Sequence, residues 1–221
     1  MTTFKAAIFD LDGTLLDSIG DLSAAMNDTL VSYGFPTFPL AHHMSAVGNG
    51  LRAYAEKCIP EEKNTPEFLD EFVKNVGMRY DGHCTEMTVP FDGILPLLDF
   101  LKSQGIKLNV LSNKLDGFAK EMIGHYFNDY GFHSVYGERP GFPKKPAPDV
   151  ALIIANECGV SPEEVLFIGD SIYDVMTGNN AGMCSVAAAW GYQSEDMLLE
   201  KKPTLLAHSP LEIIEFMKDR S

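Results

Sequence analysis

The stretch that decides the fold is Ala6-Ala7-Ile8-Phe9-Asp10-Leu11-Asp12-Gly13-Thr14. A short apolar run is followed by two aspartates and a Gly-Thr turn, which is typical of a buried strand whose last side chains meet a ligand. Buried carboxylates need a cation, a proton or hydrogen-bond donors, because removing their charge from water is costly. On this stretch alone, an acidic and solvated turn is an equal alternative.

From about residue 90 onward, the sequence alternates between strand and helix patterns. The strand patterns are short and apolar, and they cover residues 107–111, 165–168, 185–188 and 204–207. The helical patterns cover residues 95–101, a segment from about 116, residues 148–158 and residues 210–217. Such alternation predicts an α/β fold, a Rossmann-like doubly wound parallel sheet with helices on both faces.

A helical segment separates the first strand from this alternation. Ser18, with Asp21 three residues later, predicts one helix N-terminus, and Thr65-Pro66 predicts another. The intervening sequence contains no convincing strand pattern. We therefore predict a small helical cap domain over residues 17–85, inserted into an α/β core domain made of residues 1–16 and 86–221.

Charge and cysteine content exclude several classes of function. The chain has 17 basic and 31 acidic residues, a formal net charge of −14, so we expect neither a nucleic-acid nor a membrane partner. The four cysteines form no C-x-x-C pair, which argues against a zinc or redox site and favours a reducing, cytoplasmic location. The sequence has neither a membrane-spanning run nor a secretory signal pattern, and it leaves monomer and homodimer open.

Every candidate functional residue outside the helical segment follows a predicted strand or lies in a loop on the same side of the sheet. These residues are Asp10, Asp12, Ser112, Asn113, Lys144, Lys145, Asp170 and Asp174. In open parallel sheets, ligands bind at the carboxyl ends of the strands, beside the point where the strand order reverses. We therefore expect these residues to form one site.

The residue types at this predicted site suit phosphoryl transfer with Mg²⁺. Carboxylate oxygens such as those of Asp10 and Asp170 are ligands that Mg²⁺ prefers. The Ser112 hydroxyl and the Lys145 ammonium suit a phosphate, although Lys144 is the alternative inward-facing lysine. Asn113 either binds phosphate or caps the following helix. A carboxylate beside a metal and a lysine can form an aspartyl phosphate.

Four motifs in this order resemble those of the haloacid dehalogenase superfamily. They are Asp10-Leu11-Asp12-Gly13-Thr14, Ser112-Asn113-Lys114, Lys145-Pro146-x-Pro148 and Gly169-Asp170-Ser171-x-x-Asp174. The resemblance implies that Asp10 is the nucleophile and that Asp12 is the general acid and base. It also implies that Asp10, Asp170 and the backbone carbonyl of Asp12 bind Mg²⁺. Ser112 and Lys145 then hold the phosphoryl group, and Asp174 steadies the lysine or binds the metal through water.

The resemblance is closest to the phosphoglycolate phosphatase-like enzymes. Val47-Gly48-Asn49-Gly50 of this chain resembles the substrate-facing glycine loop of those enzymes. Members with dehalogenase activity lack an aspartate at the position of Asp12. We therefore predict a Mg²⁺-dependent phosphatase for a small phosphorylated metabolite, 2-phosphoglycolate or a similar compound. Arg52 is a candidate for binding the substrate carboxylate, whereas an exposed arginine is the commoner situation.

Two other functions remain open. A sugar-phosphate mutase similar to β-phosphoglucomutase shares the core motifs, and it would return the phosphoryl group to a sugar rather than to water. A phospho-accepting receiver domain also combines acidic metal ligands, a hydroxyl and a lysine. The receiver reading is disfavoured because Lys145 precedes Asp170 here, whereas the lysine comes last in receivers.

Overall fold

The computed structural model describes residues 4–219 and contains a six-stranded parallel sheet. Its central strand β1 (Ala6–Phe9) pairs with β4 (Lys107–Leu115) on one side and with β6 (Val165–Gly169) on the other. The sheet continues outward through β5 (Ser134–Glu138) next to β4, and through β7 (Cys184–Ala188) and β8 (Leu205–Ala207) next to β6. The predicted α/β class is confirmed, and the strand order reverses at β1.

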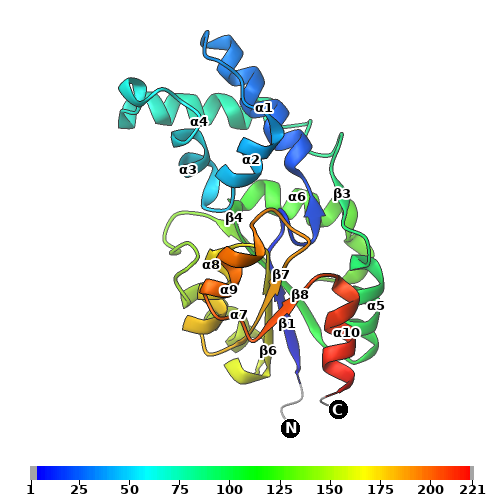
Figure 1. Ribbon diagram of the computed structural model, residues 1–221. Helices are drawn as coiled ribbons and strands as arrows, with labels where there is room; N and C mark the ends of the chain where they lie inside the picture. Colours follow the sequence, from blue (N-terminus) through cyan, green and yellow to red (C-terminus); the bar gives the residue numbers. More distant parts are fainter. Residues whose placement is uncertain (1–3, 220–221) are drawn as a thin grey trace.

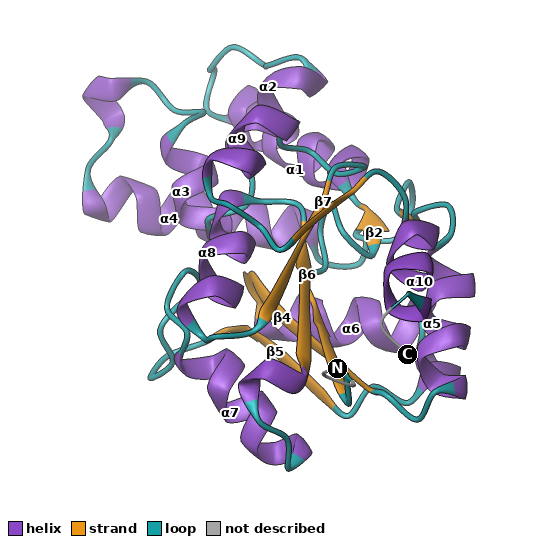
Figure 2. Cartoon of the chain, turned by 60° about the horizontal axis from the view of Figure 1, so that its bottom comes forward, coloured by secondary structure: helices purple, strands orange, loops and turns teal. Residues whose placement is uncertain are grey.

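Helices cover both faces of this sheet, as Figure 2 shows. One face packs against α5 (Ile94–Ser103), α6 (Asp116–Tyr126) and α10 (Pro210–Lys218). The other packs against α7 (Asp149–Cys158), α8 (Ile172–Asn180) and α9 (Glu195–Glu200). Successive side chains of β1 point to opposite faces, so Ala7 and Phe9 join the first core while Ala6 and Ile8 join the second. Burial on both faces explains why β1 is apolar throughout.

Four helices lie together beyond the carboxyl ends of the strands (Figure 1). They are α1 (Ile19–Ser32), α2 (Leu40–Ala46), α3 (Gly50–Glu56) and α4 (Pro66–Tyr80). The chain enters this group through β2 (Leu16–Asp17) and leaves it through β3 (Val89–Pro90), which pair antiparallel. Short 3₁₀ turns complete the structure at Glu61–Lys63, Asn128–Tyr130 and Pro162–Glu164. The described part of the chain has no helix with the length and apolarity needed to cross a bilayer.

The two predicted helix starts differ in how they are built. Thr65 caps α4 as expected, since its hydroxyl accepts a hydrogen bond from the Phe68 amide. A helix does begin after Ser18, but the hydroxyl of Ser18 makes no capping hydrogen bond and donates to Asp12 instead. Asp21 accepts from the amides of Met87 and Thr88, so it fastens α1 to the segment that leads back to the sheet. The helix N-terminus predicted at Ser18 is therefore present, but tertiary contacts rather than a local cap hold it.

Candidate active site

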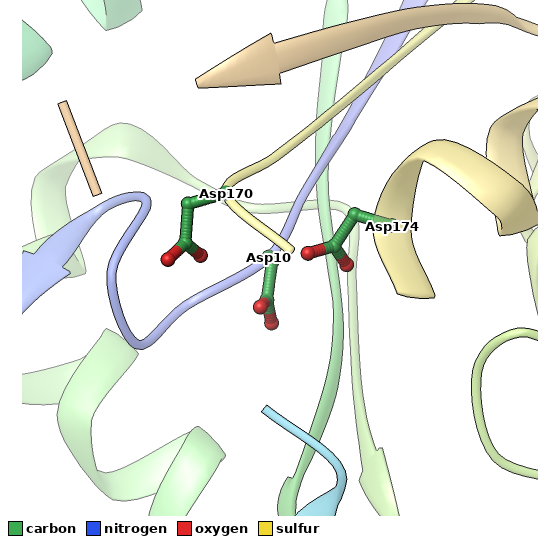
Figure 3. Close-up of side chains that lie close together, drawn as sticks. All are labelled: Asp10, Asp170 and Asp174. Atoms are coloured by element: carbon green, nitrogen blue, oxygen red, sulfur yellow. The ribbon is translucent and has the colours of Figure 1, made fainter. Parts of the chain in front are cut away.

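Three buried aspartates meet where β1 and β6 end and α8 begins (Figure 3). Asp10 follows β1, Asp170 follows β6, and Asp174 lies in the first turn of α8. One carboxylate oxygen of each lies within 4.8 Å of the others. The adjacent ends of parallel strands thus bring together residues that are 160 positions apart in the sequence.

Asp170 is held by two hydrogen bonds and by closely packed backbone. Its Oδ1 accepts a hydrogen bond of 3.0 Å from the Thr14 hydroxyl, and its Oδ2 accepts one of 2.8 Å from the Tyr192 amide. Gly13 and Gly191 flank the carboxyl group so closely that a Cβ at either would lie within 2.3 Å of an Asp170 atom. These contacts hold the carboxylate in one orientation, as a metal ligand requires.

Replacing Gly191 by alanine is expected to lower kcat/KM about 10²-fold by displacing this carboxylate. The added Cβ would lie 2.2 Å from Cβ of Asp170 and 2.4 Å from the Gly13 carbonyl oxygen. In steady-state kinetics with varied Mg²⁺, the variant should also need a higher Mg²⁺ concentration for half-maximal activity. Gly117→Ala is the matched control, because its Cβ meets nothing within 4 Å, and it should leave the kinetics unchanged. Unaltered kinetics in Gly191→Ala would contradict the role given to Asp170.

Lys145 is the lysine that faces the carboxylates. Its Nζ lies 2.9 Å from Oδ1 of Asp10 and 2.5 Å from Oδ1 of Asp174, and its side chain is 1% exposed. Burial lowers its pKa, but the two carboxylates act in the opposite direction and hold the pKa above its usual value. Lys145 therefore stays charged. The neighbouring Lys144 turns the other way and donates to the carbonyl oxygen of Asn49 at 3.2 Å.

Asn113 explains why Lys145, rather than Lys144, faces the carboxylates. Its Oδ1 accepts from the Lys145 amide at 3.0 Å, and its Nδ2 donates to the Gly48 carbonyl oxygen at 3.1 Å. Helix α6 starts at Asp116 after Leu115, so Asn113 does not cap it. Both ends of the amide are engaged with main-chain groups, and the side chain ties the lysine loop to the glycine loop between α2 and α3.

Asp174 makes two kinds of contact in the structure. Its Oδ2 accepts hydrogen bonds from the amide and the hydroxyl of Ser171, which closes a capping box at the start of α8. Its Oδ1 contacts Lys145. A helix-capping carboxylate is thereby held in a fixed position at the edge of the cluster.

The crowding of negative charge shifts two protonation equilibria. Burial, followed by repulsion from Asp174, raises the pKa of Asp10 to about 6, although Lys145 opposes this shift. Burial and the charges of Asp10 and Asp174 also raise the pKa of Asp170 well above its ordinary value. Like charges in a dry site favour the neutral acid unless a cation joins them.

The donor set fits a hard divalent cation. All three carboxylates present oxygen, which Mg²⁺ prefers, and hydrogen bonds from the Thr14 hydroxyl and the Tyr192 amide hold Asp170 in place. Moreover, Oδ1 of Asp10 is buried and accepts no well-directed hydrogen bond, even though Lys145 is close. A buried oxygen without a hydrogen bond is free to coordinate a metal.

Asp12 points away from this cluster. Its Oδ1 accepts a hydrogen bond of 2.5 Å from the Ser18 hydroxyl, and its two oxygens lie 3.0 and 3.1 Å from Nζ of Lys114. Lys114 also donates to the Tyr80 hydroxyl at 2.8 Å. Apart from the Ser112-Asn113-Lys114 motif, nothing in the sequence indicates a role for this lysine, because its partner Tyr80 lies on another element.

A cavity of about 60 Å³ lies between the sheet and the helical group. The sheet contributes Asp10, Asp12 and Ser112, and the helical group contributes Gly48 and Gly50. The oxygen of the Ser112 hydroxyl accepts from the Lys114 amide at 3.2 Å, which leaves its hydrogen available for a ligand. Pockets for drug-sized ligands measure about 300–1,000 Å³, so this one suits a much smaller molecule.

Arg52 does not reach the cavity. Its guanidinium forms an ion pair with Asp70 on α4 and lies 3.7 Å from Glu56 one turn further along α3. The side chain is 41% exposed. The structure therefore brings together the predicted core residues, Gly48 and Gly50, whereas Asn49 contributes a main-chain oxygen and Arg52 lies outside.

The sequence is similar to a known family and to named proteins over most of its length. The family model described as haloacid dehalogenase-like hydrolase matches residues 7–188. A protein from Aquifex aeolicus named phosphoglycolate phosphatase is 31% identical over 217 residues, which cover 96% of this chain and 100% of that protein. A protein from Pseudomonas aeruginosa named N-acetylmuramic acid 6-phosphate phosphatase is 30% identical, with 96% and 94% covered.

Solved structures extend these similarities to the three-dimensional fold. The crystal structure of a predicted phosphoglycolate phosphatase from Haemophilus somnus superposes with a TM-score of 0.90 at 26% identity. The superposition covers 98% of this chain and 99% of that chain. The helical group is thus matched along with the sheet.

Proposed function

Because the chain belongs to the haloacid dehalogenase-like hydrolases, we propose that it is a Mg²⁺-dependent phosphatase acting on 2-phosphoglycolate or a similarly small monoester. The observation that carries this proposal is the buried cluster of Asp10, Asp170 and Asp174 with Lys145. Mg²⁺ would be held by these carboxylates and by the carbonyl oxygen of Asp12, and would neutralise the phosphoryl oxygens.

In the proposed reaction, a carboxylate oxygen of Asp10 attacks phosphorus, and the bond from phosphorus to the ester oxygen breaks. Asp12 donates its proton to the leaving alkoxide, then takes a proton from the water that attacks the aspartyl phosphate. That attack releases inorganic phosphate and regenerates the Asp10 carboxylate. Lys145 and the Ser112 hydroxyl stabilise the negative charge on the phosphoryl oxygens.

Residues 17–85 act in this proposal as a cap that closes the site. Asn113 donates to Gly48, and Lys144 donates to Asn49, so two core side chains hold the glycine loop over the cavity. Closure excludes bulk water from the reacting groups and limits the size of the leaving group. The small cavity supports a small metabolite over a phosphoprotein.

Phosphate release from a substrate panel tests this function. The panel contains 2-phosphoglycolate, N-acetylmuramic acid 6-phosphate, β-glucose 1-phosphate, nucleotides and pyrophosphate, each with Mg²⁺ and with EDTA. We expect the highest kcat/KM for 2-phosphoglycolate, and loss of turnover in EDTA. A preference for one of the larger esters would overturn the substrate assignment. Little phosphate release together with a need for a sugar bisphosphate would identify a mutase.

A further inference from the structure

Lys114 places a positive charge inside the cavity, next to Asp12. Among the described residues that line this cavity, it is the one cationic side chain. It is 5% exposed, and the cavity is also lined by apolar side chains, including Leu22, Val76 and Phe118. A buried ammonium needs a counter-charge, because an unpaired charge in a dry site is strongly unfavourable.

All the hydrogen-bond donors of Lys114 are engaged in this structure. Two contacts go to the oxygens of Asp12, at 3.0 and 3.1 Å, and a third goes to the Tyr80 hydroxyl at 2.8 Å. Tyr80 in turn donates to Sδ of Met122, so its oxygen is the acceptor for Lys114. Tyr80 supplies no negative charge, and Asp12 is therefore the counter-ion of the lysine.

The role proposed for Asp12 conflicts with this arrangement. As the acid that protonates the leaving oxygen, Asp12 must turn a carboxyl oxygen from Lys114 to the substrate. The buried Lys114 would then lose a hydrogen bond to its counter-ion. A substrate that brings its own anion to Nζ of Lys114 removes this cost, whereas a neutral leaving group does not.

We propose that Lys114 is the specificity-determining residue that binds an anionic group on the leaving group, namely a carboxylate attached next to the ester carbon. Asp12 and Lys114 are in direct contact, so an ester oxygen at Asp12 brings such a carboxylate to the ammonium. The substrate class is the phosphate monoesters of short 2-hydroxy acids. The inference rests on the proposed function. It assigns the carboxylate to Lys114 rather than to Arg52, which is paired with Asp70 outside the cavity.

The test compares 2-phosphoglycolate with its neutral isostere, 2-phosphoglycolamide. The unmodified enzyme should favour the carboxylate in kcat/KM by about 10- to 100-fold, the usual effect of a hydrogen bond to a charged group. In Lys114→Met this preference should fall to within about threefold of unity, while Lys114→Arg should retain part of it. Arg52→Met is the matched control and should keep the full preference.

The ratio of the two substrates separates specificity from a structural role. If Lys114 only positions Asp12, Lys114→Met should lower kcat/KM equally for both substrates. An unchanged ratio of the two kcat/KM values would overturn the inference, although the proposed hydrolysis of 2-phosphoglycolate would still stand. A loss of preference in Arg52→Met would also overturn it. An enzyme that hydrolyses other esters but not 2-phosphoglycolate would refute the proposed substrate, and the inference with it. Should Lys114→Met fail to fold, inhibition of the unmodified enzyme by glycolate and glycolamide decides: equal inhibition would contradict the proposal.

Discussion

Asp10→Asn is expected to lower kcat by at least about 10⁴-fold, the scale seen when a catalytic nucleophile is removed. An amide cannot form the acyl phosphate, and no described carboxylate can replace Asp10 without moving. Asp170 is held by Thr14 and the Tyr192 amide, and Asp174 is held by Ser171 and Lys145. The site therefore has no second nucleophile ready to take over.

The same substitution should leave the metal-free fold as stable as before, or stabilise it. Asp10 is buried among like charges, and its pKa of about 6 shows that ionisation is unfavourable there. The amide removes one of three negative charges and keeps the shape. Loss of activity with an unchanged or higher Tm would separate chemistry from folding, as expected for a functional site that costs stability.

Phosphate release and thermal unfolding in EDTA measure the two effects in the same samples. Asp92→Asn, at an exposed position, is the matched control and should change neither quantity. Turnover within about tenfold of the unmodified enzyme would exclude Asp10 as the nucleophile. A large drop in Tm would mean that the carboxylate mainly serves the fold.

The sequence predicted the convergence of Asp10, Ser112 and Asp170 because each follows a short apolar run. Once β1, β4 and β6 are parallel neighbours, Asp10, Ser112 and Asp170 must lie at the same edge. The choice between Lys144 and Lys145 was not predictable in this way. It depends on a hydrogen bond from the Lys145 amide to Asn113, which lies on β4, 32 residues earlier.

Other features have weak or no signals in the sequence. Strand β5 (Ser134–Glu138) is mostly half-buried and contains a glycine and a glutamate, so it lacks the apolar run that marks the inner strands. The contacts of Lys114 and Arg52 depend on where α4 lies, since Tyr80 and Asp70 both belong to that helix. Packing between distant segments, rather than local pattern, decides which cation enters the cavity.

Mg²⁺ is expected to raise the Tm by about 5–10 °C at pH 7.5 when present at about 100 times its Kd, and to have little effect at pH 5. Removing it with EDTA should abolish turnover. The pH dependence follows from the raised pKa of Asp10 and Asp170, which make the metal-free fold favour protonated carboxyl groups. At pH 5 a metal must displace protons from the cluster, so its binding is weakened.

The sign of the effect on the metal-free protein follows from linkage. An acid whose pKa is raised from 3.8 to about 6 contributes stability below pH 4. This stability is lost as the pH rises through 6, because the folded state then holds an unfavourable charge. The raised pKa of Asp170 extends the loss to higher pH. The raised pKa of Lys145 contributes stability that stays constant below its usual value near 10.5 and is lost only above it, outside this window.

Other carboxyl groups oppose this trend, so a variant must isolate the cluster. Hydrogen bonds lower the pKa of Glu157 and Glu164, and these groups favour folding as the pH rises. Asp170→Asn removes one charge from the cluster and leaves them unchanged. Relative to the unmodified protein in EDTA, it should gain stability between pH 5 and pH 7.5 and lose most of the Mg²⁺-induced shift. If Mg²⁺ raised the Tm equally in both proteins, or equally at both pH values, the cation would bind elsewhere. Binding at these aspartates must depend both on Asp170 and on the protonation of the cluster.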